Sequence, residues 1–266
     1  MTVGLLRRGW LRVFVGGLVL LFLLERALVT TSNPNFFPSV ILLGAFLVPV
    51  TVLAYLYEAF ADWEVPLPAL AVCFLWGGAL ATVIAGTLEY DVARSLGFLP
   101  KLLIGLIEES AKLVVPLVFY FLGRHRSEAA GIVLGVATAA GFAGLETMGY
   151  GFVALLQSKA DLGVLDEVLI LRGLTSPAGH LAWTGLVTAV LWRERLRAGR
   201  PTANARVLGA FLTAVVLHTL WDTLSGVEGS GAAGSLAGWL GSLLVAVASL
   251  VLLIRRVREA RRAEPA

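Results

Sequence analysis

The chain has 266 residues, of which 58% are hydrophobic and only 15% are charged. A soluble domain of this size carries about a quarter charged residues, because its surface must be solvated. The hydrophobic residues also come in long blocks, so the excess is not one large core. This composition excludes a disordered chain, a collagen-like fibre and a nucleic-acid-binding protein. It predicts an all-α, polytopic membrane protein.

Long hydrophobic runs predict about eight transmembrane helices, each with roughly the 20 residues that cross a bilayer core. Turn-forming segments such as Asn33-Pro34-Asn35 and Gly199-Arg200-Pro201 separate the runs. The predicted spans are residues 10–29, 40–59, 68–86, 99–121, 129–156, 175–192, 207–224 and 231–254. The longest polar stretch, about 157–174, is too short for a soluble module. We therefore expect residues 1–266 to form a single integral membrane domain.

The arginines predict the orientation of the spans. Of the 21 basic residues, 15 fall before or at the start of the first span, after the eighth, or in the loops that follow the fourth and sixth spans. These residues are Arg7, Arg8, Arg12, Arg124, Arg126, Arg193, Arg195, Arg197, Arg200, Arg206, Arg255, Arg256, Arg258, Arg261 and Arg262. The positive-inside rule makes this side, and with it both termini, cytoplasmic. The first span begins like a signal peptide, but no clear cleavage site follows it, so we expect a retained anchor.

A few ionisable residues fall inside the predicted spans. Each costs roughly 2.5–3.5 kcal/mol on insertion scales, so each is a functional candidate. They are Glu108, Glu109 and Lys112 in the fourth span, Glu146 in the fifth, His180 in the sixth, and His218 and Asp222 in the seventh. Most other charged residues lie in loops or at span ends.

The spacing of these residues predicts contacts within single helices. Lys112 follows Glu108 by four residues and Glu109 by three, so its ammonium can reach either carboxylate. Asp222 follows His218 by four residues and can orient the imidazole. Small residues such as Gly131 and Gly135 indicate close helix packing in the fifth span, where Phe142 and Glu146 share a face.

Depth in the bilayer gives a second criterion. At 1.5 Å per residue, the paired glutamates, Glu146 and the two histidines lie roughly 8–15 Å below the outer ends of their spans. Asp222 is shallower, at about 3 Å. Spans four to seven alternate in direction, yet their polar groups fall in the same outer half of the bilayer. The sequence therefore predicts that these groups form one site.

This set of residues suits hydrolysis, which needs a base to take a proton from water and a group to stabilise the oxyanion. A desolvated carboxylate holds a proton more tightly, which suits a base near neutral pH. Two roles fit the histidines: they could donate hydrogen bonds to the oxyanion, or His180 and His218 could join Glu146 in holding a zinc ion. The three zinc ligands would come from three different helices, because no compact HExxH motif is present. A site without a cofactor is therefore the alternative to a zinc site.

Three motifs on successive spans carry a family resemblance. Glu108-Glu109-Ser-Ala-Lys112 reads as EExxK, Phe142 to Glu146 as FxxxE, and His218 to Asp222 as HxxxD, with His180 between the last two. In order, spacing and placement these motifs resemble the PrsW family of intramembrane proteases. The resemblance covers approximately residues 99–226.

The related type II CAAX prenyl endopeptidases carry EExxxR, FxxxH and HxxxN in the corresponding places. This chain has a lysine, Lys112, one position before the place of the arginine, and Glu146 in place of the histidine. These differences argue against processing of prenylated proteins.

The resemblance implies a peptidase, metallo- or glutamate-type, in a bacterial plasma membrane. Its substrate would be a single-pass or otherwise membrane-anchored protein, in known members an anti-sigma factor, cut near the extracytoplasmic side. Glu108 and Glu109 would activate water, His218 would be essential, and Glu146 and His180 would complete the site. The remaining motif residues would support it: Lys112, Phe142 and Asp222.

Two other functions use such residues in a membrane. A non-catalytic scaffold or chaperone of the same fold should have lost a paired glutamate or a histidine, and this chain retains them all. A proton-coupled transporter also uses intramembrane Glu, His and Lys. It would show broken helices near the bilayer midplane and repeat symmetry, and neither can be read in the sequence. The bilayer is the expected surrounding in every case, and no nucleic-acid partner is expected.

Overall fold

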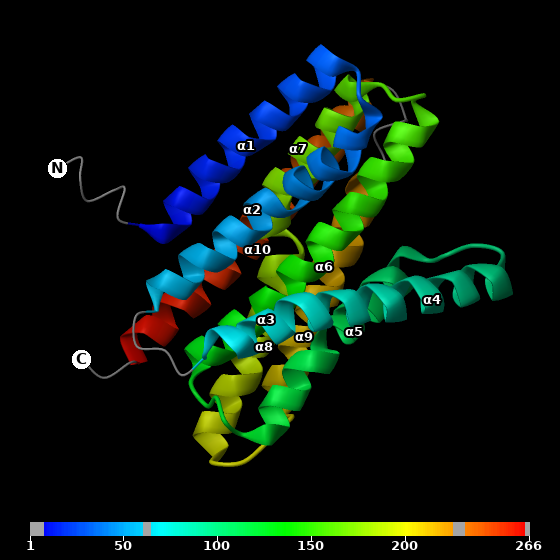
Figure 1. Cartoon of the computed structure of the whole chain (residues 1–266). Coiled ribbons are helices and arrows are strands. Elements are labelled where there is room, and N and C mark those ends of the chain that lie inside the picture. Colours follow the sequence, from blue (N-terminus) through cyan, green and yellow to red (C-terminus); the bar gives the residue numbers. More distant parts are fainter. Residues whose placement is uncertain (1–7, 61–64, 226–231, 264–266) are drawn as a thin grey trace. The chain divides into compact units, whose positions relative to one another are not determined.

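The computed structural model describes residues 8–60, 65–225 and 232–263, which form helices and connecting turns without a strand (Figure 1). This confirms the all-α prediction. Arg7, Gly226 and Gly231 belong to predicted segments but lie outside the described residues. The chain divides into two compact units, Met1–Ala61 with Ala143–Pro177 and Asp62–Phe142 with Ala178–Ala266. The chain passes from one unit to the other three times, and the second of these passages falls inside one helix, α6 (Glu128–Gln157).

The first unit contains α1 (Gly9–Thr31), α2 (Phe37–Ala59), α7 (Leu162–Thr175) and residues 143–157 of α6. α1 and α2 run side by side in opposite directions (Figure 1). The short 3-10 helix η1 (Pro34–Phe36) joins them. The turn forms because Asn33 caps η1 by accepting a hydrogen bond from the Asn35 amide, and because Pro34 begins it with a fixed φ.

All of α7 except its last residue, Thr175, lies in the stretch 157–174, for which the sequence predicted a polar segment and no helix. The Asp161 side chain caps its first turn by accepting hydrogen bonds from two backbone amides. Leu165 and Leu169 are buried, and α7 packs on α2. Gly44 of α2 permits this packing, because a Cβ there would lie 2.9 Å from a Leu169 methyl group.

The second unit holds the other helices. α3 (Leu67–Val72), the π-helical turn η2 (Cys73–Gly77) and α4 (Gly78–Leu96) follow one another without a break. α5 (Lys101–Leu122) packs on α4, α9 (Ala205–Ser225) and α8 (His180–Ala198). α10 (Ala232–Ala263) packs on α8 and α9. The 3-10 turn η3 (Ser176–Ala178) contains the passage from the first unit to the second, and Gly179 separates it from α8.

Glycines bring the helices of the second unit close together. A Cβ on Gly131 of α6 would lie 2.7 Å from the Cβ of Trp192 and 2.8 Å from the Thr188 carbonyl of α8. Gly135, one turn later, also faces Thr188. The predicted packing role of these two glycines is confirmed.

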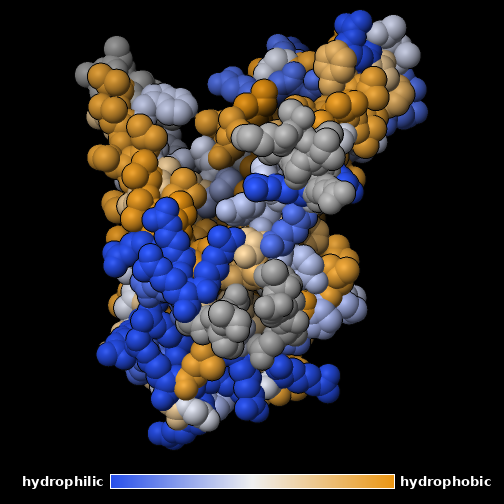
Figure 2. Space-filling view, turned by 90° about the vertical axis from the view of Figure 1, so that its left-hand side faces the viewer, coloured by the Kyte–Doolittle hydropathy of each residue, from blue (hydrophilic) through white to orange (hydrophobic). Residues whose placement is uncertain are grey.

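Six helical segments of the described chain are long and apolar enough to cross a membrane. They are Gly9–Thr31, Pro34–Ala59, Leu67–Leu96, Glu128–Gln157, Ala205–Ser225 and Leu236–Arg262. Large hydrophobic side chains such as Phe22, Trp76 and Leu244 are exposed on them, and Figure 2 shows broad hydrophobic areas on one face of the molecule. The chain is therefore a multi-pass membrane protein.

The other two predicted spans correspond to α5 and α8, in which charged residues shorten the uninterrupted apolar run. α5 contains Glu108, Glu109 and Lys112 in its middle. α8 ends in a charged turn that includes Glu194 and Arg195. The apolar character of these helices is thus interrupted by the predicted site in one case and by a predicted cytoplasmic end in the other.

Candidate active site

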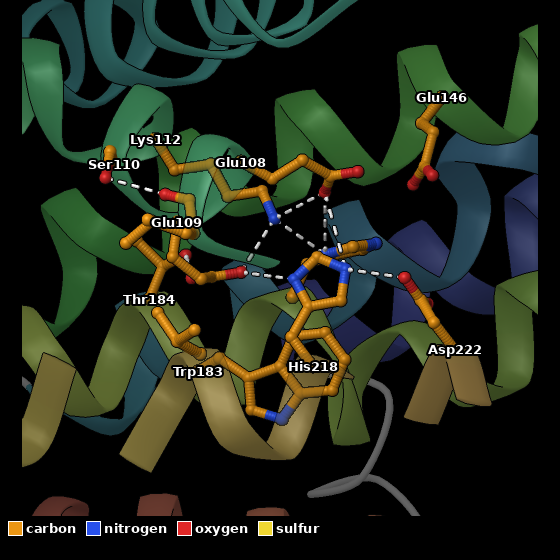
Figure 3. Close-up of polar contacts among 12 residues, drawn as sticks. Glu108, Glu109, Ser110, Lys112, Glu146, Trp183, Thr184, His218 and Asp222 are labelled. Atoms are coloured by element: carbon orange, nitrogen blue, oxygen red, sulfur yellow. Dashed lines mark hydrogen bonds and ion pairs between the residues drawn. The ribbon is translucent and has the colours of Figure 1, made fainter. Parts of the chain in front are cut away.

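Three helices of the second unit bring the predicted polar residues together (Figure 3). Glu108, Glu109 and Lys112 lie on α5, His180 begins α8, and His218 lies on α9. All but His180 are buried, and His180 is nearly so. A Cβ on Gly105 would lie 3.1 Å from the Val215 carbonyl and 3.4 Å from the His218 Cβ, so this glycine lets α9 approach α5.

Lys112 lies at the centre of the cluster and is fully buried. Its Nζ lies 3.1 Å from Glu108 Oε2, 2.8 Å from Glu109 Oε1 and 2.8 Å from His180 Nδ1. The ring of Phe142 on α6 faces the same ammonium, with its centroid 4.2 Å away. The predicted contacts of Lys112 with both carboxylates are present, and the contact with His180 links α5 to α8.

The imidazole of His218 contacts both glutamates through different nitrogens. Its Nδ1 lies 3.1 Å from Glu109 Oε1, and because a carboxylate only accepts, this nitrogen carries the hydrogen. Its Nε2 lies 3.6 Å from Glu108 Oε2 and 3.7 Å from Asp222 Oδ2. Glu109 thus orients the imidazole through Nδ1, a role that the sequence spacing predicted for Asp222, and Nε2 faces Glu108 and Asp222.

Glu109 is held by three side chains from three helices. Its Oε1 faces Lys112 and His218, and its Oε2 accepts a hydrogen bond from Thr184 Oγ1 at 3.1 Å. The residue is only 1% exposed. Both oxygens of Glu109 therefore have hydrogen-bond partners within the protein. Glu108 Oε2 faces the Lys112 ammonium and both histidines.

Two residues that sequence reasoning missed complete the surroundings of the histidines. The indole of Trp183 stacks on His218, with ring centroids 4.6 Å apart and planes at 24°, and Thr184 holds Glu109. Trp183 and Thr184 follow His180 by three and four residues on α8. Residues at this spacing share a helix face, which was the signal that could have identified them.

The donor atoms of Glu108, His180 and His218 lie within 4.8 Å of one another and could hold a metal ion. This set includes Glu108, whereas the expected set included Glu146. Two histidines and one carboxylate are a known donor set for catalytic zinc. The hydrogen bond from His218 Nδ1 to Glu109 is the support that metal-binding histidines usually receive. The side chains present therefore fit a metal ion by donor type and by spacing.

Glu146 belongs to the other unit and has a different partner. Its Oε2 lies 2.7 Å from a guanidinium nitrogen of Arg172 on α7. Arg172 also hydrogen-bonds Thr147 and lies over the ring of Tyr150, 4.0 Å from its centroid. The carboxylate of FxxxE is thus paired with an arginine.

Comparison with protein families matches residues 65–254, well over half of the chain, to the PrsW family intramembrane metalloproteases. The chain belongs to the PrsW family. The predicted resemblance is confirmed, and the matched residues include every motif residue from Glu108 to Asp222. The PrsW family consists of membrane-embedded peptidases. Searches of curated proteins and of solved structures found no match.

Proposed function

We propose that this PrsW protein is an intramembrane endopeptidase in which Glu108 activates the attacking water. The observation that carries this proposal is the position of Glu108 Oε2, which faces the Lys112 ammonium and both histidines. Glu109 accepts hydrogen bonds from Lys112, His218 and Thr184. Glu108 faces His218 Nε2 across 3.6 Å, where a reacting group would meet both side chains.

In the proposed reaction Glu108 takes a proton from water as the water attacks the scissile carbonyl carbon. The same carboxyl group then gives the proton to the departing amine, as a general acid. Lys112 keeps a positive charge beside Glu108 and positions it. Glu109 orients His218, and Asp222 borders its Nε2.

The family name implies a metal, which Glu108, His180 and His218 would hold. Bound there, a divalent ion would polarise the scissile carbonyl and would itself activate water, so Glu108 would then be a ligand and not the base. A glutamate-type mechanism remains a second candidate, because the Lys112 ammonium already contacts Glu108 Oε2 and His180 Nδ1. In that mechanism His180 accepts from Lys112 through Nδ1 and donates through Nε2 to the oxyanion.

We further propose that α5 and α8 also cross the membrane, giving eight spans with both termini in the cytoplasm. The 15 basic residues at one set of span ends support this orientation. It would place the paired glutamates in the extracytoplasmic half of the bilayer. The substrate would then be a membrane-anchored protein, such as an anti-sigma factor, cut near its extracytoplasmic side in a bacterial plasma membrane.

The test compares membrane proteomes of host cells that make the wild type, Glu108→Gln or Ser110→Ala at equal levels. Ser110 is an exposed neighbour on α5 whose hydroxyl donates a hydrogen bond to the Leu106 carbonyl of its own helix, so it is the matched control. We expect one full-length membrane protein to accumulate with Glu108→Gln, and its shortened form to appear with the wild type and Ser110→Ala. If no protein changes length, the scaffold function replaces the protease.

The metal requirement is tested on the purified protein by elemental analysis. A metalloprotease would bind about one zinc ion per chain, and the His218→Gln and Glu108→Gln variants would bind far less. A wild type that cleaves its substrate after complete removal of metal would establish the glutamate-type mechanism.

A further inference from the structure

Both site histidines contact the same buried tryptophan, Trp183 of α8. Its indole stacks on His218 with nearly parallel planes. The same indole meets His180 edge-on, with ring centroids 5.3 Å apart and planes at 84°. The two imidazoles also lie edge-to-face against each other, at 5.1 Å and 76°. A rotation of the indole would therefore disturb both histidines together.

The orientation of this indole is fixed by a helix that lies behind it. Trp183 Nε1 donates a hydrogen bond to Ser249 Oγ on α10, at 2.9 Å. The Ser249 hydroxyl donates in turn to the Val245 carbonyl of its own helix, at 2.8 Å. Trp183 and Ser249 are each only 1% exposed, so neither bond has water as an alternative partner.

We propose that Trp183 is a positioning residue that sets the ring planes of His180 and His218, and that Ser249 sets the orientation of Trp183. Among the described residues, the hydrogen bond from Trp183 Nε1 to Ser249 Oγ connects α10 to the ring that contacts both histidines. The inference rests on the proposed function in that the two histidines matter for cleavage. Its structural part, the effect of Ser249 on the histidines, can be measured without any cleavage.

The chain offers a favourable probe because it contains only three histidines. In a protein labelled at histidine, NMR spectra of the imidazole ring show His125, His180 and His218 separately, and single His→Gln variants assign them. A neighbouring indole shifts ring signals strongly. His125 lies near Phe119, at 6.0 Å between centroids, and serves as an internal reference.

Ser249→Ala is compared with Ser242→Ala, the matched control. Ser242 is a buried serine on the same helix whose hydroxyl has no hydrogen-bond partner in the described structure. We expect Ser249→Ala to shift or broaden the signals of His180 and His218 and to leave that of His125 in place. Ser242→Ala should leave all three unchanged. Unmoved His180 and His218 signals in Ser249→Ala would overturn the proposal, even if that variant unfolds at a lower temperature.

The catalytic consequence is measured as the ratio of shortened to full-length substrate in the host membranes. Loss of a group that orients a site histidine costs roughly tenfold or more in comparable sites, so Ser249→Ala should lower this ratio by about tenfold. Trp183→Phe keeps an aromatic ring but lacks the N–H group, so Ser249→Ala should lower the ratio no further in that background. A further loss there would overturn the role of the hydrogen bond.

The two proposals can fail separately. If the histidine signals respond to Ser249→Ala but the wild type cleaves no protein, the positioning contact stands and the proposed peptidase function fails. If the wild type cleaves and the signals do not respond, only the positioning contact fails.

Discussion

Glu109 Oε1 and His218 Nδ1 lie 3.1 Å apart although 109 residues separate them in the chain. The contact joins α5 to α9 and decides which nitrogen of His218 faces Glu108. A carboxylate that accepts from Nδ1 leaves Nε2 as the reactive nitrogen. The two neighbouring glutamates therefore have different surroundings, and their substitutions should have different effects.

Glu108→Gln should reduce cleavage more than Glu109→Gln. Loss of a general base costs about 10²–10⁴-fold, whereas loss of a carboxylate that orients a histidine costs about 10–100-fold. The ratio of shortened to full-length substrate in host membranes, at equal protein levels, measures both. Equal losses would contradict the division of roles, and a larger loss with Glu109→Gln would reverse it.

Lys112→Met should destabilise the protein by about 3–5 kcal/mol, because it leaves two buried carboxylates without their shared cation. Unfolding of the purified protein in detergent measures this loss. Adding Glu109→Gln to Lys112→Met should restore part of the stability, since it removes one of the two charges. Ser110→Ala, on the exposed side of α5, should have no effect.

Gly131→Ala should also lower stability, by about 1–3 kcal/mol. The added methyl group would meet Trp192 Cβ at 2.7 Å and the Thr188 carbonyl at 2.8 Å, so α6 and α8 would have to move apart. Gly209 of α9 has open space around its Cα, and Gly209→Ala should stabilise by about 0.5–1 kcal/mol. Thermal unfolding of the two variants should therefore shift in opposite directions.

Glu194→Gln tests a pH dependence beyond the end of the predicted sixth span. Hydrogen bonds from Asn204, and further ones from Arg206 and Arg197, hold the pKa of Glu194 below its ordinary value. Because the folded-state pKa is lowered, the charged form stabilises the protein fully above the ordinary pKa of about 4.3. That contribution is lost as the pH falls through the lower folded-state pKa.

The wild type should accordingly be more stable than Glu194→Gln near neutral pH, and the difference should shrink as the pH falls below about 4.3. Unfolding of both proteins from neutral pH down to below this pKa measures the difference in stability. A difference that stays constant with pH would show that the carboxylate charge is not what stabilises the turn between α8 and α9.

Most of the helices could be predicted from the sequence, because a membrane-spanning helix needs a long apolar run and leaves a plain signal. The helix α7 was missed, since its stability comes from packing Leu165 and Leu169 on α2 rather than from its own composition. Pairing of Lys112 with the glutamates followed from spacing on one helix. The partner of Glu146 could not be predicted from spacing, because Arg172 lies on a separate helix.

The sequence by itself determined the membrane character, the helical class, the family and the short-range pairs on α5, because these depend on composition and on spacing within one helix. Only the tertiary structure decided that Glu109 orients His218, that Glu108 joins the two histidines as a candidate metal site, and that Trp183 lies beneath His218. These contacts join different helices. Their geometry depends on how closely glycines such as Gly105 let the helices approach, which spacing along the chain does not encode.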